Sequence, residues 1–166
     1  MLIRPFAPGD EAGIAELYNH YILNTTVTFE EVPLTPQAMR ERIDAYRAHH
    51  PWLVAEDGGQ IVGYAYGSRF HARAAFRHTA EVSVYVRDGH ERRGIARALY
   101  APLIAFLGGQ GVHAVLAVIS LPHEASVGLH EALGFEPKGR LTEVGFKFGR
   151  WLDIGYWQLN LVGSAV

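Results

Sequence analysis

Apolar residues in the first third of the chain recur at spacings that predict one strand and two helices. The apolar-rich segment Leu2–Phe6 has the pattern of a short strand. Asp10 is the expected cap of a helix whose apolar face is Ile14, Leu17, Tyr18, Tyr21 and Ile22. Thr35 as cap and Pro36 in the first turn predict a second helix running to about His49, because a proline there loses no hydrogen bond.

The middle of the chain predicts a hairpin followed by a strand, a helix and a second strand. Residues 52–56 and 60–66 flank the turn 57–59, whose two glycines permit positive φ. Residues 80–87 place apolar and polar side chains alternately, with the period of a strand. The next strand-like segment is 112–119, and the helix expected between the two has apolar residues at helical spacing: Ile95, Leu99, Leu103 and Phe106. A crossover of this kind makes parallel neighbours.

The last third predicts a short helix, Glu124–Leu133, ended by Gly134, and a final hairpin of residues 137–146 and 151–161. Together these elements predict an α/β fold with a mixed, mostly antiparallel sheet and one parallel pair near its middle. The length of 166 residues fits one domain, residues 1–166, since domains cluster at roughly 100 to 150 residues.

Charge and composition narrow the classes of partner. The formal net charge of -2 gives no basic surface for nucleic acid or anionic membrane, so we expect a small-molecule partner. No window approaches the ~18 apolar residues of a membrane span, and the first residues do not form a leader, so we expect a cytoplasmic protein. The chain has nine histidines, but it has no cysteine and no His-Glu-x-x-His pattern, so we expect no metal.

The most informative segment is the strand around 82–86, the loop 87–93 and the helix start Gly94-Ile95-Ala96-Arg97. A strand, a turn and a helix N-terminus in this order present free N–H groups and a positive dipole end to one point, which suits a pyrophosphate. Small residues at positions 94 and 96 would let phosphates approach the backbone. The alternative is an ordinary strand-to-helix turn with a basic surface.

Motifs in and around this segment resemble those of the GNAT acetyltransferases, in their cofactor strand, pyrophosphate loop and late helix: Arg92-Arg93-Gly94-Ile95-Ala96, Ala117-Val118-Ile119, Ser126–His130 and Glu131–Phe135. Further segments resemble the phosphinothricin and methionine sulfoximine acetyltransferases, so that the resemblance covers nearly the whole chain: Tyr18–Tyr21, Pro51–Glu56, Phe76–Glu81 and Phe146–Asp153. It implies the GNAT fold, with helices on both faces of a sheet whose parallel pair is splayed. It also implies transfer of an acetyl group from acetyl-CoA to the primary amine of a small amino-acid-like substrate, by a homodimer.

The resemblance assigns the acetyl-CoA site to three segments: Val84, Tyr85, Val86, then Arg92, Arg93, Gly94, Ile95, Ala96 and Arg97, then His123 and Ser126. Two positions depart from the family pattern. Glu91 stands where a Gln or Arg usually opens the loop, so Arg92 and Arg93 have to neutralise it. His123 stands where an Asn commonly contacts the pantetheine arm.

Two residues are candidates for proton transfer. Glu81, on the strand beside the cofactor segment, is the expected general base; the alternative is a carboxylate paired with Arg77 or Arg92. A partly buried carboxylate there should have a raised pKa, as a base working near neutrality needs. His130 stands where many GNAT enzymes place a Tyr that protonates the departing thiolate, and is the expected general acid. The alternative is a surface or core histidine.

The resemblance implies that Phe29 lines the acceptor pocket. A basic cluster, His71, Arg73 and Arg77, is the other part of the expected acceptor site, because arginine binds a carboxylate through two hydrogen bonds. A solvated basic loop is the alternative. Two other functions stay open: a GNAT enzyme acting on protein N-termini or lysines, and a CoA-binding regulatory module without turnover. A homodimer is also suggested by the aromatic-rich last hairpin: Phe146, Phe148, Trp151, Tyr156 and Trp157.

Overall fold

The computed structural model describes residues 1–161; residues 162–166 of the expected domain lie outside this part. The strands are β1 (Leu2–Pro5), β2 (Trp52–Asp57), β3 (Gln60–Arg69), β4 (Thr79–Val86), β5 (Ala114–Leu121), β6 (Glu136–Lys147) and β7 (Arg150–Asn160). The helices are α1 (Glu11–Asn24), α2 (Pro36–Arg47), α3 (Ile95–Gly109) and α4 (Glu124–Ala132), with a 3-10 turn, η1, at Ala74–Phe76. All seven strands form one sheet in the order β1-β2-β3-β4-β5-β7-β6.

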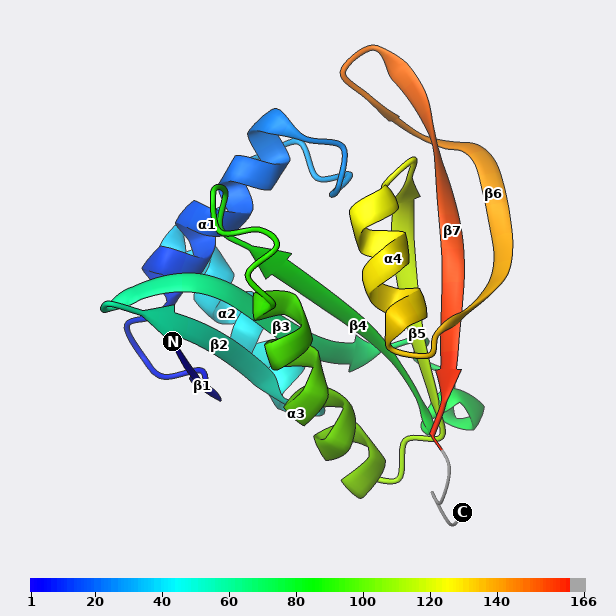
Figure 1. Cartoon of the computed structure of the whole chain (residues 1–166), viewed down its shortest axis with the longest axis horizontal. Helices are drawn as coiled ribbons and strands as arrows, with labels where there is room; N and C mark the ends of the chain where they lie inside the picture. Colours follow the sequence, from blue (N-terminus) through cyan, green and yellow to red (C-terminus); the bar gives the residue numbers. More distant parts are fainter. Residues whose placement is uncertain (162–166) are drawn as a thin grey trace.

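The sheet is antiparallel except at its centre, where β4 and β5 are parallel. These two strands pair only along Thr79–Glu81 and Ala114–Leu116, and then they diverge (Figure 1). Each strand keeps its other partner, β3 for β4 and β7 for β5, so the sheet opens into a V instead of breaking. The prediction of a mixed sheet with a splayed parallel pair is confirmed.

Helices cover both faces of the sheet. α1 and α2 pack on one face, and α3 and α4 lie on the other (Figure 1). The α1/α2 side has an aromatic core in which Trp52 stacks on Tyr64 and Tyr66 with interplanar angles of 5° and 6°. The α3 side has an aliphatic core around Leu99 and Leu103, both fully buried. The helices formed by residues 1–161 include none long and apolar enough to cross a membrane.

Local signals in the sequence locate most elements. Thr35 caps α2, since its hydroxyl accepts the N–H of Ala38 at 3.1 Å. Gly58 and Gly59 turn the β2–β3 hairpin with φ of 57° and 80°. Asp10 occupies the predicted N-cap position of α1, but its side chain does not cap the helix: the carboxylate accepts the N–H of Ala7 instead. Asp10 has helical φ and ψ and is bound by Arg4 at 2.7 and 2.8 Å, so its side chain cannot turn over the first turn of α1.

Candidate active site

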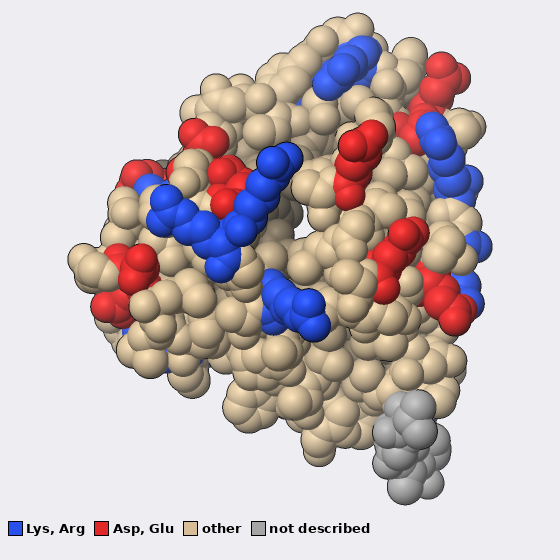
Figure 2. All heavy atoms as spheres, in the orientation of Figure 1, with Lys and Arg blue, Asp and Glu red and all other residues tan. Residues whose placement is uncertain are grey.

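The opening of the V leads into a cleft of about 810 Å³ on the α3/α4 side of the sheet. Its walls are formed by β4, the loop between β4 and α3, the first turn of α3 and the first turns of α4, and Tyr21 of α1 and Val27 of the α1–α2 loop complete the lining. Figure 2 shows this face hollowed in the middle, with arginine side chains along the rim formed by the β4–α3 loop. A narrower space continues inward between β4 and β5 and reaches Tyr100 and His130.

The edge of β4 turns unpaired backbone groups toward this cleft. The N–H of Arg87 binds the carbonyl oxygen of Val62 on β3, so, by the alternation along a strand, the N–H groups of Val84 and Val86 face the gap. The carbonyl oxygen of Val86 also faces the gap, where it accepts the hydroxyl of Tyr21 at 2.6 Å. The side chains of Val84 and Val86 line the cleft. Two backbone donors are therefore available to a bound carbonyl.

The loop between β4 and α3 is built to hold an anion. Gly94 takes the left-handed conformation, with φ of 76°, at the position before α3, and no side chain caps the helix. The first-turn N–H groups, from Ile95 to Arg97, therefore have no partner within the helix, and these three residues line the cleft. A Cβ added to Gly94 would meet no atom within 4 Å, which leaves room for a ligand against the backbone.

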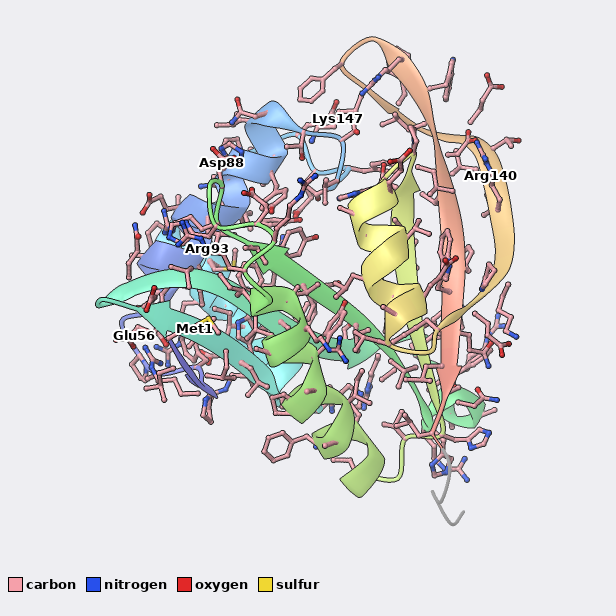
Figure 3. The ribbon with its side chains drawn as sticks, viewed as in Figure 1. Met1, Glu56, Asp88, Arg93, Arg140 and Lys147 are labelled. Carbon is pink, nitrogen blue, oxygen red and sulfur yellow. The ribbon has the colours of Figure 1, made fainter. Side chains whose placement is uncertain are left out.

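The charges around this loop are mixed. Arg92, which has a φ of 60°, and Arg97 line the cleft, but so does Glu91. Arg93, labelled in Figure 3, lies on the same loop but is not part of the cleft wall. In the described part of the chain none of these four side chains forms an ion pair with another. Compensation of Glu91 by arginine thus stays a prediction, with Arg92 the better placed of the two expected arginines.

The α4 side of the cleft contains both residues expected there, His123 and Ser126. Nδ1 of His123 accepts the N–H of Ser126 at 3.3 Å, so this imidazole caps α4. Burial lowers the pKa of His123, which keeps the ring neutral and able to accept that bond. The position of His123, directly before α4, indicates its capping role from the sequence once the start of the helix is known. That His123 also lines the cleft is visible only in the structure.

Tyr85 contributes to the cleft in a different way from its neighbours. Its ring lies on the α1/α2 side, where it meets Tyr18 and Tyr21 edge-on at centroid distances of 5.0 and 5.2 Å and stacks with Tyr64 at 5.2 Å. Burial holds its pKa well above the usual range, so the hydroxyl stays protonated. Tyr85 thus belongs to the aromatic core and borders only the inner gap.

Glu81 occupies the last residue pair before β4 and β5 separate, opposite Leu116. Its side chain lies on the α1/α2 face of the sheet, as do those of Ser83 and Tyr85, two and four residues later in the strand. No other side chain in residues 1–161 hydrogen bonds or pairs with its carboxylate, so the expected alternatives, Arg77 and Arg92, do not neutralise it. Burial raises the pKa of Glu81. An unpaired carboxylate with a raised pKa can accept a proton near neutrality.

His130 lies at the inner end of the gap, in the core, with 3% of its surface exposed. Nδ1 is 2.7 Å from the carbonyl oxygen of Ser126 and therefore carries the hydrogen, because a carbonyl only accepts. Nε2 of His130 then accepts the hydroxyl hydrogen of Tyr100, whose oxygen is 3.1 Å away. Burial lowers the pKa of His130, which favours this neutral ring. Tyr100, which the sequence did not single out, and His130 both line the inner gap, and this hydrogen bond gives a proton a path from His130 through Tyr100.

The residues expected to bind the acceptor do not meet in one cavity. His71, Arg73 and Arg77 line a cavity of about 660 Å³, together with Arg69, His49, His50 and the loop after α3. We call it the basic cavity; its described lining contains no Asp or Glu and no residue of the cleft. Phe29 lies in the loop between α1 and α2 and contacts β6 near Gly145. Their role in acceptor binding stays a prediction.

Tyr21 is a cleft residue that the sequence did not single out. It belongs to the apolar stripe of α1, and such a stripe indicates core packing. Only the fold brings its hydroxyl to Val86, 65 positions later in the chain. Within the described residues, no group of three or more His, Asp or Glu side chains is arranged to hold a metal ion.

Comparison with known proteins identifies the family. A model described as an acetyltransferase (GNAT) domain matches residues 3–155. Phosphinothricin N-acetyltransferase of Streptomyces viridochromogenes is 42% identical over 156 residues, which cover 94% of this chain and 85% of that protein. An L-methionine sulfoximine/L-methionine sulfone acetyltransferase of Pseudomonas paraeruginosa is 41% identical over 161 residues, covering 96% and 94%.

A solved structure agrees with these sequence matches. A GNAT superfamily phosphinothricin acetyltransferase from Sinorhizobium meliloti, in complex with acetyl-CoA, superposes with a TM-score of 0.93 at 36% identity, covering 96% of this chain and 88% of that one. The chain therefore belongs to the GNAT family of acetyltransferases. It is an acetyl-CoA-dependent N-acetyltransferase, and acetyl-CoA is its cosubstrate.

Proposed function

We propose that this enzyme acetylates the primary amine of a small amino-acid-like acceptor of the phosphinothricin, methionine sulfoximine or methionine sulfone type. The names of the relatives at 42% and 41% identity support this acceptor class. The observation that carries the chemistry is the half-buried, unpaired carboxylate of Glu81 at the vertex of the V. An amino-acid acceptor binds as an ammonium ion, so it needs such a base before it can attack.

The cleft fits acetyl-CoA, which when bound supplies its acetyl group as a thioester. The free N–H groups at Gly94–Arg97 and the space beside Gly94 suit its pyrophosphate, and Arg92 adds a charge. The edge of β4 suits the pantetheine arm. The N–H of Val84 or Val86 would polarise the thioester carbonyl.

Glu81 takes the proton of the acceptor ammonium, directly or through a water, from the α1/α2 side of the V. The departing thiolate needs a proton in return, and His130 is the proposed source. A proton on Nε2 of His130 passes to the oxygen of Tyr100 while the hydroxyl proton of Tyr100 passes to sulfur. The step requires protonated His130, so it is favoured as the pH falls, and burial, which lowers the pKa of His130, moves this dependence below the ordinary imidazole range.

Acceptor recognition is assigned to Phe29, with the basic cluster His71, Arg73 and Arg77 as a separate candidate, because the two do not share a cavity. Guanidinium groups suit the acceptor carboxylate or phosphinate, which offers two oxygens. Arg73→Met and Arg77→Met test this assignment. The variant that lacks the arginine bound to the acceptor is expected to show a raised KM for the acceptor. An unchanged KM in both variants would assign the basic cavity to something other than the acceptor.

The test is thiol release from acetyl-CoA with a panel of amines: free amino acids, methionine sulfone, methionine sulfoximine, phosphinothricin and a lysine peptide. We expect turnover with one of the sulfone, sulfoximine or phosphinothricin acceptors to exceed turnover with the peptide. Preference for the peptide would make the enzyme a protein acetyltransferase. Tight acetyl-CoA binding without turnover of any amine would indicate a regulatory module.

We also propose a homodimer. The outer hairpin exposes an apolar surface through Phe146, Phe148 and Trp151, the last of them 61% exposed. Trp157, by contrast, is 7% exposed and belongs to the core, so its expected place in this surface is wrong. Sedimentation at micromolar concentration is expected to give a dimer, and a monomer would contradict the proposal.

A further inference from the structure

Lys147, the last residue of β6, is buried without an ion pair among the described residues. Its side chain is 2% exposed, although lysine is almost never fully buried unless it is paired. Nζ donates a hydrogen bond to the carbonyl oxygen of Thr28 at 2.8 Å and lies 5.0 Å from the ring centre of Phe148. Burial lowers the pKa of Lys147, against the opposing charges of Glu31 and Glu30. Burial of an ammonium group without an ion pair costs free energy, so Lys147 is expected to have a role that offsets this cost.

The contact of Lys147 with Thr28 joins the two halves of the sheet. Thr28 lies in the loop between α1 and α2, on the half formed by β1 to β4, whereas Lys147 lies on the half formed by β5, β7 and β6. These halves pair directly only along Thr79–Glu81, at the vertex. Figure 3 shows Lys147 at the opposite, open end of the V, between that loop and the β6–β7 hairpin. The hydrogen bond is a second link, across the opening.

Phe29, the next residue of the loop, makes a further contact across the same opening. Its ring lies directly on Gly145 of β6, where an added Cβ would come closer than 3.0 Å to three ring carbons. Because Gly145 has no side chain, the ring of Phe29 can pack directly against the backbone of β6. β6 is irregular beside it, with a register shift between Leu141 and Gly145 and a φ of 54° at Glu143.

The loop is also anchored on its own side. The hydroxyls of Tyr18 and Thr28 are 2.7 Å apart, Tyr18 donates to Glu30, and Arg42 binds both oxygens of Glu30 at 2.8 and 2.6 Å. These bonds fix residues 28–30 to α1 and α2. Lys147 and Gly145 are the described contacts that fix the same residues to the other half of the sheet. Neither residue, nor Phe29, lines the acetyl-CoA cleft.

We propose that Lys147 and Gly145 are positioning residues for the acceptor: together they latch the α1–α2 loop across the open end of the V and hold Phe29 in place. We call the contacts Lys147–Thr28 and Gly145–Phe29 the latch. The inference rests on the proposed function, in which Phe29 belongs to the acceptor site. The latch residues themselves are not part of the cleft wall, where the loop contributes only Val27, so loss of the latch is expected to act far more on acceptor binding than on acetyl-CoA binding.

The chain offers matched controls for both halves of the latch. Gly139 lies on the same strand as Gly145, and a Cβ there meets no atom within 4 Å, so Gly139→Ala controls for Gly145→Ala. Lys138, also on β6, is exposed and pairs with Glu136, so Lys138→Met controls for Lys147→Met. Phe29→Ala provides a background in which alanine at position 145 has room.

The experiment measures KM for acetyl-CoA and for whichever amine the wild-type enzyme acetylates, together with hydrogen exchange of residues 25–35. Gly145→Ala and Lys147→Met are expected to raise acceptor KM on the order of tenfold or more and to speed exchange of the loop. KM for acetyl-CoA should stay within about twofold of wild type, as should both constants in the two controls. In the Phe29→Ala background, Gly145→Ala should add nothing.

Several results would overturn the latch. Unchanged exchange in both variants would show that the loop is held without it, and this measurement needs no acceptor. Faster exchange with unchanged acceptor KM would remove its role in positioning. Equal rises of both KM values, or an effect of Gly145→Ala that persists without the Phe29 ring, would indicate general distortion. A wild-type enzyme that acetylates no amine contradicts the proposed function instead, while exchange still decides on the latch.

Discussion

The two sides of the V are built from different parts of the polypeptide. On the acetyl-CoA side the available groups are largely backbone: N–H groups of Val84, Val86 and the first turn of α3, beside a glycine that leaves space. On the proposed acceptor side they are side chains: Glu81, and Arg42 and Lys147, which hold the α1–α2 loop. In the proposed function, backbone donors bind the cosubstrate that is common to the whole family. Side chains can change with the acceptor while the backbone stays.

Two carboxylates on the acceptor side show how the surroundings divide their roles. Hydrogen bonds from Arg42 lower the pKa of Glu30, and they outweigh the rise caused by burial. Glu81 has no such partner, and burial raises its pKa. Glu30 therefore stays ionised and holds the loop, whereas Glu81 can exchange a proton.

The largest effect is expected from Glu81→Gln, which keeps the shape of the side chain but cannot accept a proton. Turnover near neutrality should fall by roughly 10² to 10⁴, the usual contribution of a positioned base. Relative to the wild type at the same pH, raising the pH should recover part of the loss, because more of the amine is then free and needs no base. Steady-state rates across pH are the measurement, with Glu41→Gln, on the exposed surface of α2, as control. Near wild-type turnover with an unshifted profile would end the assignment of Glu81 as base.

On the backbone side, Gly94→Val should weaken acetyl-CoA binding by about tenfold or more, since the valine side chain would keep the pyrophosphate away from the backbone N–H groups of the loop. Gly89→Val is the matched control, because Gly89 has a φ of 78°, open space around it and no place in the cleft wall. Both variants carry the same backbone strain. Titration calorimetry with acetyl-CoA should show weakened binding in Gly94→Val and not in Gly89→Val. Equal losses of affinity in the two variants would mean that the loop is only a turn.

The pH profile of turnover tests both proton-transfer roles. Glu81 must be ionised, so activity should fall as the pH decreases through its pKa, which lies above the ordinary 4.5. His130 must be protonated to act as an acid, so activity should fall as the pH rises through its pKa, below the ordinary 6.5. His130→Phe should remove only the alkaline fall. Wild-type turnover that stays constant above the ordinary imidazole pKa would contradict the acid role.

The smallest effect concerns stability on the acceptor side. Arg42→Met should lower the free energy of unfolding by about 1 kcal/mol, because the Arg42–Glu30 pair is partly exposed and screened. The pKa of Glu30 is lowered in the folded state, so this stabilisation is present above its unfolded value, ordinarily 4.5, and is lost as the pH falls through the folded value. Urea unfolding at two pH values measures it. Arg40→Met, which removes a surface pair with Asp44, should cost less.

The sequence by itself determined the parts of this protein that depend on neighbouring residues. Period-two and helical spacings located the strands and helices, Thr35 located the start of α2, and the glycines at 58 and 59 located a hairpin turn. The segment from Val82 to Arg97 indicated an anion site, because the strand, turn and helix that form it are contiguous. Motifs dispersed along the chain added the family and, through it, the proposed roles of Glu81 and His130.

Only the tertiary structure decided which residues share a site. It separated β4 from β5 after Glu81, sent the ring of Tyr85 to the aromatic core, and placed Arg73 and Arg77 in a cavity apart from the cleft. It also buried Lys147 against Thr28, 119 positions away. Local periodicity fixes which face of an element a side chain occupies, but it carries no information on the partner across the sheet. That partner is set by the packing of the whole chain, where burial and long-range hydrogen bonds are decided together.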